Sequence, residues 1–232
     1  MRLLLISNSG KPFLEHCMGQ IAAFLGPARR VVFVTAANLY DEPAYYERAR
    51  AALGAAPPAG CGAHVLHLRW DADPLAVLER AEALFVGGGN TYALLKRLQE
   101  GGLLDPIRTR VRAGLPYIGS SAGSNVAGPS VLTSNDWNVV GLTVFGALAL
   151  VPFNINPHYL ETDPAMAPGS ETRDERIREY HVVHSSPVVG IEEGTVLRVE
   201  DGVAIVLGRG RVKAFARGRE PRWYRAGERV EV

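Results

Sequence analysis

Short apolar runs alternate along the chain with longer segments in which apolar residues recur at every third or fourth position. The apolar runs are Leu3–Ile6, Val31–Val34, Val65–Leu68, Leu84–Val86 and Pro116–Gly119. A continuous apolar run of this length is typical of a strand that is buried on both faces. Such strands are usually parallel neighbours, which need long crossover connections. The pattern therefore predicts an α/β protein.

The segments between the runs have the periodicity and the end signals of helices. The expected helices are 13–25, 41–53, one opened by Asp73-Pro74, one ending at about Gln99 and one opened by Asp105-Pro106. Helices on both faces of a mainly parallel central sheet make a three-layer sandwich. Ligands bind such sheets at the carboxyl ends of the strands. Candidate chemistry is therefore expected in the loops that follow the apolar runs.

The pattern changes from about Val188 onward. Shorter β-like runs are separated there by Glu193-Gly194, Asp201-Gly202 and Gly208-Arg209-Gly210, which predicts antiparallel hairpins closing one edge of the sheet. Before them, the segment 171–184 reads as a charged helix, with Thr172 and Glu175 spaced for a capping box. No repeat, linker or low-complexity tract interrupts the chain, so we expect one domain spanning residues 1–232.

Composition narrows the classes of partner. The 232 residues are 47% hydrophobic, enough for one sizeable core, and 25 Lys and Arg against 24 Asp and Glu leave a formal net charge of +1. A nearly neutral chain has no field to attract nucleic acid or an anionic membrane surface. Cys17 and Cys61 lack metal-ligand spacing and are expected as reduced thiols, and no apolar stretch is long enough for a signal peptide or a membrane span. We expect a cytoplasmic protein, a monomer or homodimer, without a metal or cofactor.

Gly119-Ser120-Ser121-Ala122-Gly123 matches the G-x-S-x-G pattern of a nucleophile elbow. It follows an apolar run and precedes residues that can start a helix, which is the context the motif requires. Glycines at both flanking positions remove the Cβ atoms that would clash in so tight a turn. Ser120 and Ser124 are rivals, but only Ser121 has glycine on both sides. We expect Ser121 to be a nucleophile, although such a turn also occurs without a catalytic role.

A serine nucleophile needs a base, and His158 is the candidate among six histidines. It follows the extended segment 152–157, which ends in Asn-Pro and would place the imidazole at the carboxyl end of a strand. Asp136, in a loop between the elbow and this strand, is the acid expected to orient the imidazole. Glu161 and Asp163 are alternatives. An ordinary Asn-Asp turn is the competing interpretation of Asp136.

Gly87–Gly89 follows a buried strand and precedes a helix. The amides of Gly88 and Gly89, together with that of Ala122 after the nucleophile, are expected to stabilise the oxyanion of an acyl-transfer reaction. A phosphate-binding loop is the alternative. It is disfavoured because neither G-x-G-x-x-G nor a P-loop motif is present.

Taken together, these segments resemble peptidase E, the family of α-aspartyl dipeptidases related to the cyanophycinases. The likeness spans nearly the whole chain. The matching segments are residues 3–9, 86–91, 117–125, 135–136, 155–158 and 169–173. The resemblance implies a flavodoxin-like fold akin to the class I glutamine amidotransferases, with Ser121, His158 and Asp136 as the catalytic triad.

The resemblance also implies a small peptide substrate, a dipeptide with an N-terminal aspartate. Arg173 would bind the aspartate carboxylate, because a planar guanidinium matches a carboxylate with two hydrogen bonds. Arg176 could play the same part, and an ion-paired surface arginine is the competing interpretation of either. Asn90 is expected as a further polar contact.

Three departures from the family affect the expected specificity. Ser120 stands where the family often has a bulky aromatic residue, and Ser124 stands where it has alanine; the segment 159–170 also differs. The alternatives to an aspartyl dipeptidase are a related serine peptidase of different or broader specificity, or a catalytically silent small-molecule binding protein. An amidotransferase is disfavoured because its elbow carries cysteine.

Overall fold

An eight-stranded sheet forms the centre of the computed structural model, which describes residues 1–161, 169 and 171–232. Its strand order is β12-β9-β8-β1-β5-β4-β2-β3. The five parallel strands are β1 (Arg2–Ile6), β5 (Tyr117–Ser120), β4 (Ala83–Val86), β2 (Arg30–Val34) and β3 (His64–Leu68). Four of the apolar runs lie within these strands, and the fifth, Pro116–Gly119, overlaps β5, so the prediction of a mainly parallel central sheet is confirmed.

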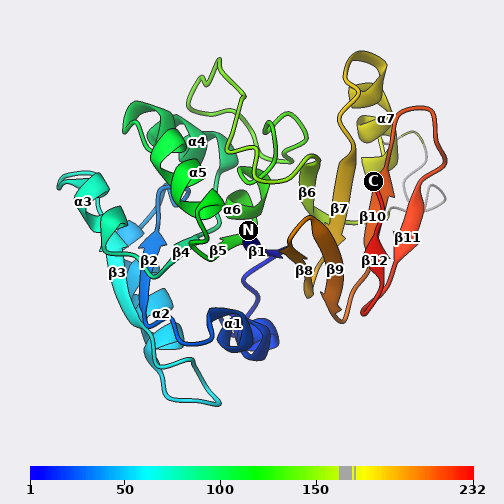
Figure 1. Ribbon diagram of the computed structural model, residues 1–232. Coiled ribbons are helices and arrows are strands. Elements are labelled where there is room, and N and C mark those ends of the chain that lie inside the picture. The colour runs from blue at the N-terminus through cyan, green and yellow to red at the C-terminus, as the bar shows by residue number, and fades with distance from the viewer. Residues whose placement is uncertain (162–168, 170) are drawn as a thin grey trace.

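Helices cover both faces of this sheet, as Figure 1 shows. They are η1 (Glu15–Cys17), α1 (Met18–Leu25), α2 (Glu42–Gly54), α3 (Pro74–Glu79), α4 (Thr91–Glu100), α5 (Leu104–Arg112) and α6 (Ala122–Asn125). In β1, Leu4 and Ile6 pack in the cluster with α1 and α2, whereas Leu3 and Leu5 pack in the cluster with α3, α4 and α5. Each such buried aliphatic side chain contributes about 1.5–3 kcal/mol. The alternation explains why the strands are apolar at every position.

The C-terminal strands divide between two sheets. β8 (Thr195–Glu200), β9 (Val203–Gly208) and β12 (Arg229–Val230) extend the central sheet antiparallel beyond β1. The other sheet has the order β11-β10-β7-β6 and consists of β6 (Asn154–Tyr159), β7 (Val188–Glu192), β10 (Val212–Phe215) and β11 (Arg222–Tyr224). β6 and β7 are parallel, and α7 (Arg173–Val183) packs on this second sheet through Ile177. The sequence predicted the hairpins but not their division.

Several local signals behave as the sequence indicates. Asp41 and Asp73 accept backbone N–H groups as the N-caps of α2 and α3, and Thr172 and Glu175 form the capping box of α7. Each cap contributes about 1 kcal/mol. The helix expected from Phe13 differs, because α1 begins only at Met18. Leu14 has a φ of 60°, a left-handed conformation that an α-helix does not contain.

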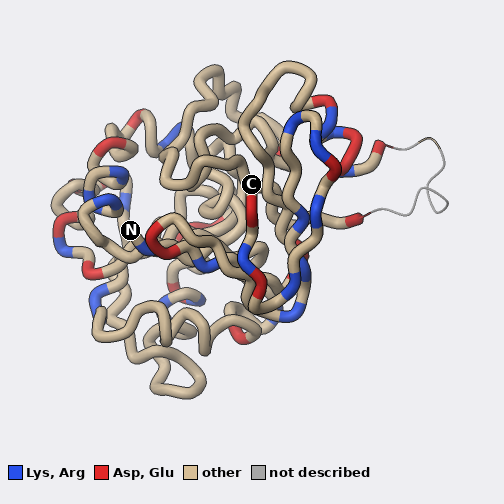
Figure 2. The backbone as a smooth tube through the Cα atoms, turned by 45° about the vertical axis from the view of Figure 1, so that its right-hand side comes forward, with Lys and Arg blue, Asp and Glu red and all other residues tan. Residues whose placement is uncertain are grey.

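One apolar cluster joins the two sheets. It contains Leu3 and Leu5 of β1 together with Ile155 of β6, Val189 of β7 and Val212 of β10. This shared core supports the inference that residues 1–232 form one domain. Figure 2 shows acidic and basic residues interspersed around the molecule, in keeping with the net charge of +1. Among the described residues, no helix combines the length and apolar character that crossing a bilayer requires.

Candidate active site

Ser121 occupies a strained turn between β5 and α6, with φ 51° and ψ −109°. The chain can turn here only because two neighbours lack a side chain. A Cβ on Gly119 would lie 2.4 Å from the carbonyl oxygen of Gly123, and a Cβ on Gly123 would lie 2.0 Å from that of Val86. The two glycines of the motif are therefore required by close backbone contacts, and the elbow predicted from the sequence is present.

Only one of the three neighbouring serines contacts a histidine in the described part of the chain. The hydroxyl of Ser120 is buried and lies 2.9 Å from that of Ser9. The hydroxyl of Ser124 is also buried and donates to the carbonyls of Ile6 and Gly119. Ser121 Oγ lies 2.9 Å from His158 Nε2. The expected nucleophile and base therefore meet, although they are far apart in the sequence.

His158 stands on β6, at the point where the pairing of β6 with β7 shifts register, and has a φ of 53°. Its backbone N–H donates to Ser7 Oγ at 2.9 Å, and the Ser7 hydroxyl donates to the carbonyl of Ile191 at 2.8 Å. Ser7 follows β1 of the central sheet, whereas His158 and Ile191 belong to the second sheet. One buried serine thus links the two sheets directly beside the imidazole.

The acid on the other imidazole nitrogen is Glu193. His158 Nδ1 lies 2.5 Å from Glu193 Oε1. Glu193 occupies the turn between β7 and β8, and this turn is fixed by the Gly194 N–H, which donates to Asn8 Oδ1 at 3.0 Å. In the sequence, Glu193-Gly194 has only the pattern of a hairpin turn. The available signal was that Glu193 directly follows a strand, where parallel neighbours bring their carboxyl ends together.

The expectation that Asp136 orients His158 is corrected by this geometry. Asp136 Oδ2 accepts the N–H of Thr91 at 2.8 Å and the hydroxyl of Ser134 at 3.3 Å, and within the described residues it makes no hydrogen bond to His158. Thr91 is the first residue of α4, where unpaired amides and the helix dipole attract a carboxylate. Glu161, an alternative acid, pairs with Lys213 instead. Asp163 lies outside the described residues.

The glycine loop after β4 packs against the nucleophile, as expected. A Cβ on Gly88 would lie 3.1 Å from Ser121 Cβ. The Gly88 N–H, however, donates to the Tyr45 hydroxyl at 2.8 Å, so this amide is not a free oxyanion donor. Among the described residues, the amides of Gly89 and Ala122 have no hydrogen-bond acceptor. Of the three oxyanion donors that the sequence suggested, the amides of Gly89 and Ala122 are therefore still available.

Arg173 is the first residue of α7 and lies in a pocket of about 440 Å³. Its guanidinium donates to Asn135 Oδ1, and the Asn135 amide group donates to the carbonyl of Pro157, the residue before His158. Burial, and then the nearby Arg176, lower the pKa of Arg173. Arg176 itself is exposed and paired with Glu171. No carboxylate pairs with Arg173 in the described part of the structure, so of the two arginines it is the one left with an uncompensated charge.

Asn90 has a structural explanation. Its side-chain oxygen accepts the N–H of Ala93 as the N-cap of α4, and its amide group donates to the carbonyl of Trp137. Both polar ends are therefore engaged. The expectation of Asn90 as a substrate contact is corrected, because binding substrate would break the cap or the contact with the 136–137 loop.

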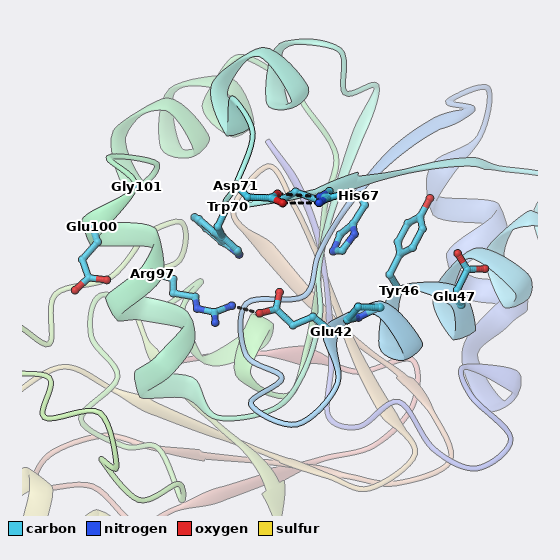
Figure 3. A pocket seen from close by; sticks show the side chains of 11 residues that line it. Glu42, Tyr46, Glu47, His67, Trp70, Asp71, Arg97, Glu100 and Gly101 are labelled. Carbon is cyan, nitrogen blue, oxygen red and sulfur yellow. Dashed lines mark hydrogen bonds and ion pairs between the residues drawn. The ribbon is translucent and has the colours of Figure 1, made fainter.

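A separate hollow of about 860 Å³ lies at the carboxyl ends of β2 and β3 (Figure 3). Its arginines are already paired, Arg97 with Glu42 and Arg69 with Asp71. Ser121 and His158 are not among its lining residues. Over the residues that the structure describes, no three His, Cys, Asp or Glu side chains are grouped to hold a metal ion.

Comparison with known proteins adds an independent line of evidence. The sequence pattern of peptidase family S51 matches residues 3–207. The chain is 44% identical over 225 residues to peptidase E of Streptomyces coelicolor, covering 96% of this chain and 90% of that protein. It is 47% identical over 219 residues to a probable alpha-aspartyl dipeptidase of Drosophila melanogaster, covering 92% and 89%. It is 42% identical over 236 residues to peptidase E of Salmonella typhimurium, covering 99% and 100%.

Solved structures agree with the fold. A putative peptidase E protein from Listeria monocytogenes superimposes with a TM-score of 0.69 at 24% identity, covering 90% of this chain and 98% of that one. A peptidase from an acI-B1 actinobacterium gives a TM-score of 0.74 at 17% identity, covering 100% and 96%. The serine elbow and its histidine thus lie in a fold shared with known peptidases, and the sequence match spans most of the chain. This protein belongs to peptidase family S51.

Proposed function

We propose that this chain is a serine dipeptidase that hydrolyses the peptide bond after an N-terminal aspartate. The chemistry rests on one observation, the hydrogen-bonded series from Ser121 Oγ through His158 to Glu193. A serine hydroxyl becomes an effective nucleophile when a base accepts its proton, and the base is most effective when an acid fixes its tautomer. All three groups are in contact here.

In the proposed reaction, His158 Nε2 accepts the Ser121 proton as Oγ attacks the aspartyl carbonyl. Glu193 holds the proton on Nδ1 and stabilises the imidazolium that forms. His158 then gives its proton to the leaving amine, and an acyl-enzyme on Ser121 remains. A water molecule, activated by the same imidazole, releases aspartate. Two amides, those of Gly89 and Ala122, stabilise the tetrahedral oxyanion, each lowering the barrier by about 2.7–4 kcal/mol.

The preference for aspartate is assigned to Arg173. Two relatives are named peptidase E and one is named a probable alpha-aspartyl dipeptidase, so an acidic substrate is expected for this chain as well. The guanidinium is partly buried and lacks a carboxylate partner in the described residues. A substrate carboxylate would supply the missing charge, whereas a neutral side chain would leave it uncompensated.

Covalent labelling tests the chemistry. A fluorophosphonate should acylate Ser121, and the modified peptide should be identified by mass spectrometry. Ser121→Ala should abolish labelling and lower kcat by at least about 10⁴-fold, since the groups act as a unit. Ser120→Ala is the control for the neighbouring hydroxyl. Absence of labelling, together with no turnover of Asp-Xaa dipeptides, would favour a binding protein without catalysis.

A panel of dipeptides that varies the N-terminal residue tests the specificity. Asp-Leu should be cleaved well, and Asn-Leu and Ala-Leu poorly. Arg173→Met should lower kcat/KM for Asp-Leu by about 10- to 100-fold, the value of a charged hydrogen bond. Arg176→Met is the matched control and should change it little. Equal loss in both variants, or none in Arg173→Met, would show that another group binds the carboxylate.

The cysteines and the composition of the site bear on location and assembly. The two free thiols, Cys17 buried and Cys61 partly buried, support a reducing compartment such as the cytoplasm. A small peptide substrate requires no second subunit to form the site as the structure shows it. We propose a cytoplasmic protein that is a monomer or homodimer, and analytical ultracentrifugation would test its assembly.

A further inference from the structure

A lysine side chain is buried on the face of the second sheet that α7 covers. Lys213 lies in β10, and its side chain is only 8% exposed. Its ammonium lies 4.9 Å from the ring centroid of Trp223, 5.5 Å from that of Phe215 and 5.9 Å from that of Tyr159. A charge in such surroundings is retained only when it is paired and hydrogen-bonded.

Two carboxylates supply that pairing. Lys213 Nζ donates to Asp174 Oδ2 at 2.8 Å and to Glu161 Oε1 at 3.2 Å. The other oxygen of Asp174 accepts the Tyr159 hydroxyl. Burial, and then the hydrogen bond to Asp174, raise the pKa of Tyr159, so this hydroxyl stays protonated and remains a donor. Lys213, Asp174 and Tyr159 therefore form one connected polar cluster, the Lys213 cluster.

The members of this cluster are next to the residues that the proposed reaction uses. Tyr159 directly follows His158, and Asp174 directly follows Arg173. His158 is held in a left-handed conformation that a non-glycine residue does not favour, so its neighbours must be fixed in place. Tyr159 is fixed by the sheet as well: a Cβ on Gly190 would lie 2.6 Å from Tyr159 Cδ2. The ring therefore fits closely against the backbone of β7 at a position where only glycine leaves room.

We propose that Lys213 is a positioning residue, whose ammonium holds the catalytic base in register through Tyr159 and the substrate-binding arginine through Asp174. This inference rests on the proposed function. Without the ammonium, Asp174 and Glu161 would face each other as two carboxylates in a partly buried site. Asp174 would turn toward solvent, Tyr159 would lose its fixed acceptor, and both His158 and Arg173 would lose one support.

The nearby Arg211 does not provide the same link. Its guanidinium stacks 3.8 Å above the Trp223 ring and binds Glu192 at 2.7 Å. It approaches Glu161 only to 3.7 Å, and among the described residues it makes no hydrogen bond to Asp174. Removal of Lys213 therefore cannot be compensated by the cation already present.

Four variants test the proposal, with kcat and KM for Asp-Leu and the rate of Ser121 labelling, each per folded molecule. Tyr159→Phe, which removes one hydroxyl, should lower kcat and the labelling rate by about tenfold and leave KM nearly unchanged. Lys213→Met should lower kcat by about 10- to 100-fold and also raise KM by about tenfold, because both supports are lost. Lys213→Arg, which keeps the charge, should have kcat and KM close to those of the wild type. Arg222→Met removes an exposed ion pair between β11 of the same sheet and Glu231, and should change neither kcat nor KM.

The outcomes separate this inference from the proposed function. If the wild-type protein neither labels nor cleaves Asp-Leu, the proposed function fails. If wild type is active and folded Lys213→Met matches it in kcat, KM and labelling, only the positioning role fails. A purely structural role would lower the melting temperature of Lys213→Met without changing the rates per folded molecule, and this too would overturn the proposal. Should Lys213→Met not fold, Tyr159→Phe decides, because unchanged labelling in that variant contradicts the link to His158.

Discussion

The nucleophile and its base are held in place by different kinds of contact. Ser121 is fixed by atoms close to it in the central sheet, where Gly119 and Gly123 allow backbones to approach and leave no room for anything larger. His158 is fixed by direct hydrogen bonds to Ser7 and Glu193, which are distant from it in the sequence. The first arrangement is steric, and the second is a set of hydrogen bonds across two sheets.

This difference predicts how the elbow around Ser121 and the surroundings of His158 respond to mutation. A clash in the elbow cannot be relieved by small adjustments, because the neighbouring atoms are backbone. A lost hydrogen bond around His158 leaves its other contacts in place, so the loss should be graded. Adding a side chain to an elbow glycine should therefore cause a large loss of activity, whereas removing one hydrogen bond around the base should cause a smaller loss.

Among substitutions that leave Ser121, His158 and Glu193 in place, the largest effect is expected for Gly123→Ala. The added methyl would lie 2.0 Å from the Val86 carbonyl oxygen, so the elbow must move. We expect a fall in kcat of at least about 100-fold, the cost of roughly 1 Å of misplacement, and a loss of about 1–3 kcal/mol in unfolding free energy. Gly146→Ala is the control, because nothing lies within 4 Å of its Cβ position. Near-normal kinetics in Gly123→Ala would show that the elbow is not sterically fixed.

Substitutions of Glu193 and of Asp136 should lower kcat for different reasons, because only Glu193 contacts the imidazole. Gln at 193 keeps a hydrogen-bond acceptor but cannot stabilise an imidazolium as a carboxylate does, so kcat should fall by about 10- to 100-fold, the value of one hydrogen bond to a charged group. Asp136→Asn keeps an acceptor for the Thr91 amide and should retain activity within about tenfold, whereas Asp136→Ala loses it and should do worse. If Asp136 oriented the base, Asn and Ala would be equally harmful. Steady-state kinetics on the three variants measures this.

Ser7→Ala and Ser124→Ala together compare the surroundings of His158 with the elbow. It removes the group that accepts the His158 N–H and donates to Ile191, so activity should fall about tenfold and unfolding free energy by about 1–3 kcal/mol. Ser124→Ala removes a similarly buried hydroxyl that contacts only the elbow side, at Ile6 and Gly119. It should cost comparable stability in urea unfolding but less activity. Equal losses of activity in Ser7→Ala and Ser124→Ala would contradict the distinction between the elbow and the surroundings of His158.

The smallest effect is expected at Cys17. Burial raises the pKa of its thiol to about 12, so at pH 8 only about one molecule in 10⁴ carries the reactive thiolate. Treatment of the folded protein with iodoacetamide at pH 8 should therefore leave Cys17 unmodified and activity unchanged. Mass spectrometry of the treated protein checks this. Inactivation through Cys17 would mean that the core packed against α1 opens readily.

The parallel half of the fold could be predicted because each of its strands is buried on both faces and therefore reads as an apolar run. The second sheet could not, since short β runs separated by glycine turns look alike whichever sheet they join. The same limitation affected the acid. Asp136 was expected because it lies between the elbow and His158 in the sequence, whereas Glu193 reaches the imidazole only through the pairing of β7 with β6.

The polar residues show a second limit. Asn90 and the Gly88 amide have the right chemistry for a substrate site, but the structure uses them for a helix cap and for a hydrogen bond to Tyr45. Residue type indicates what a group can do, and only its neighbours show whether it is free to do so. The neighbours of Arg173 leave its charge without a carboxylate among the described residues, whereas Arg176 pairs with Glu171. The sequence alone could not distinguish the two arginines.

The contacts of Ser7 have a consequence for protein synthesis. Ser7 is translated well before its partners His158 and Ile191, which lie 151 and 184 positions further along the chain. Contacts this distant form late, after the intervening segments have been made. A growing chain can therefore complete its serine turn before the histidine has been translated, and hydrolysis must wait for the segment that carries Ile191 and Glu193.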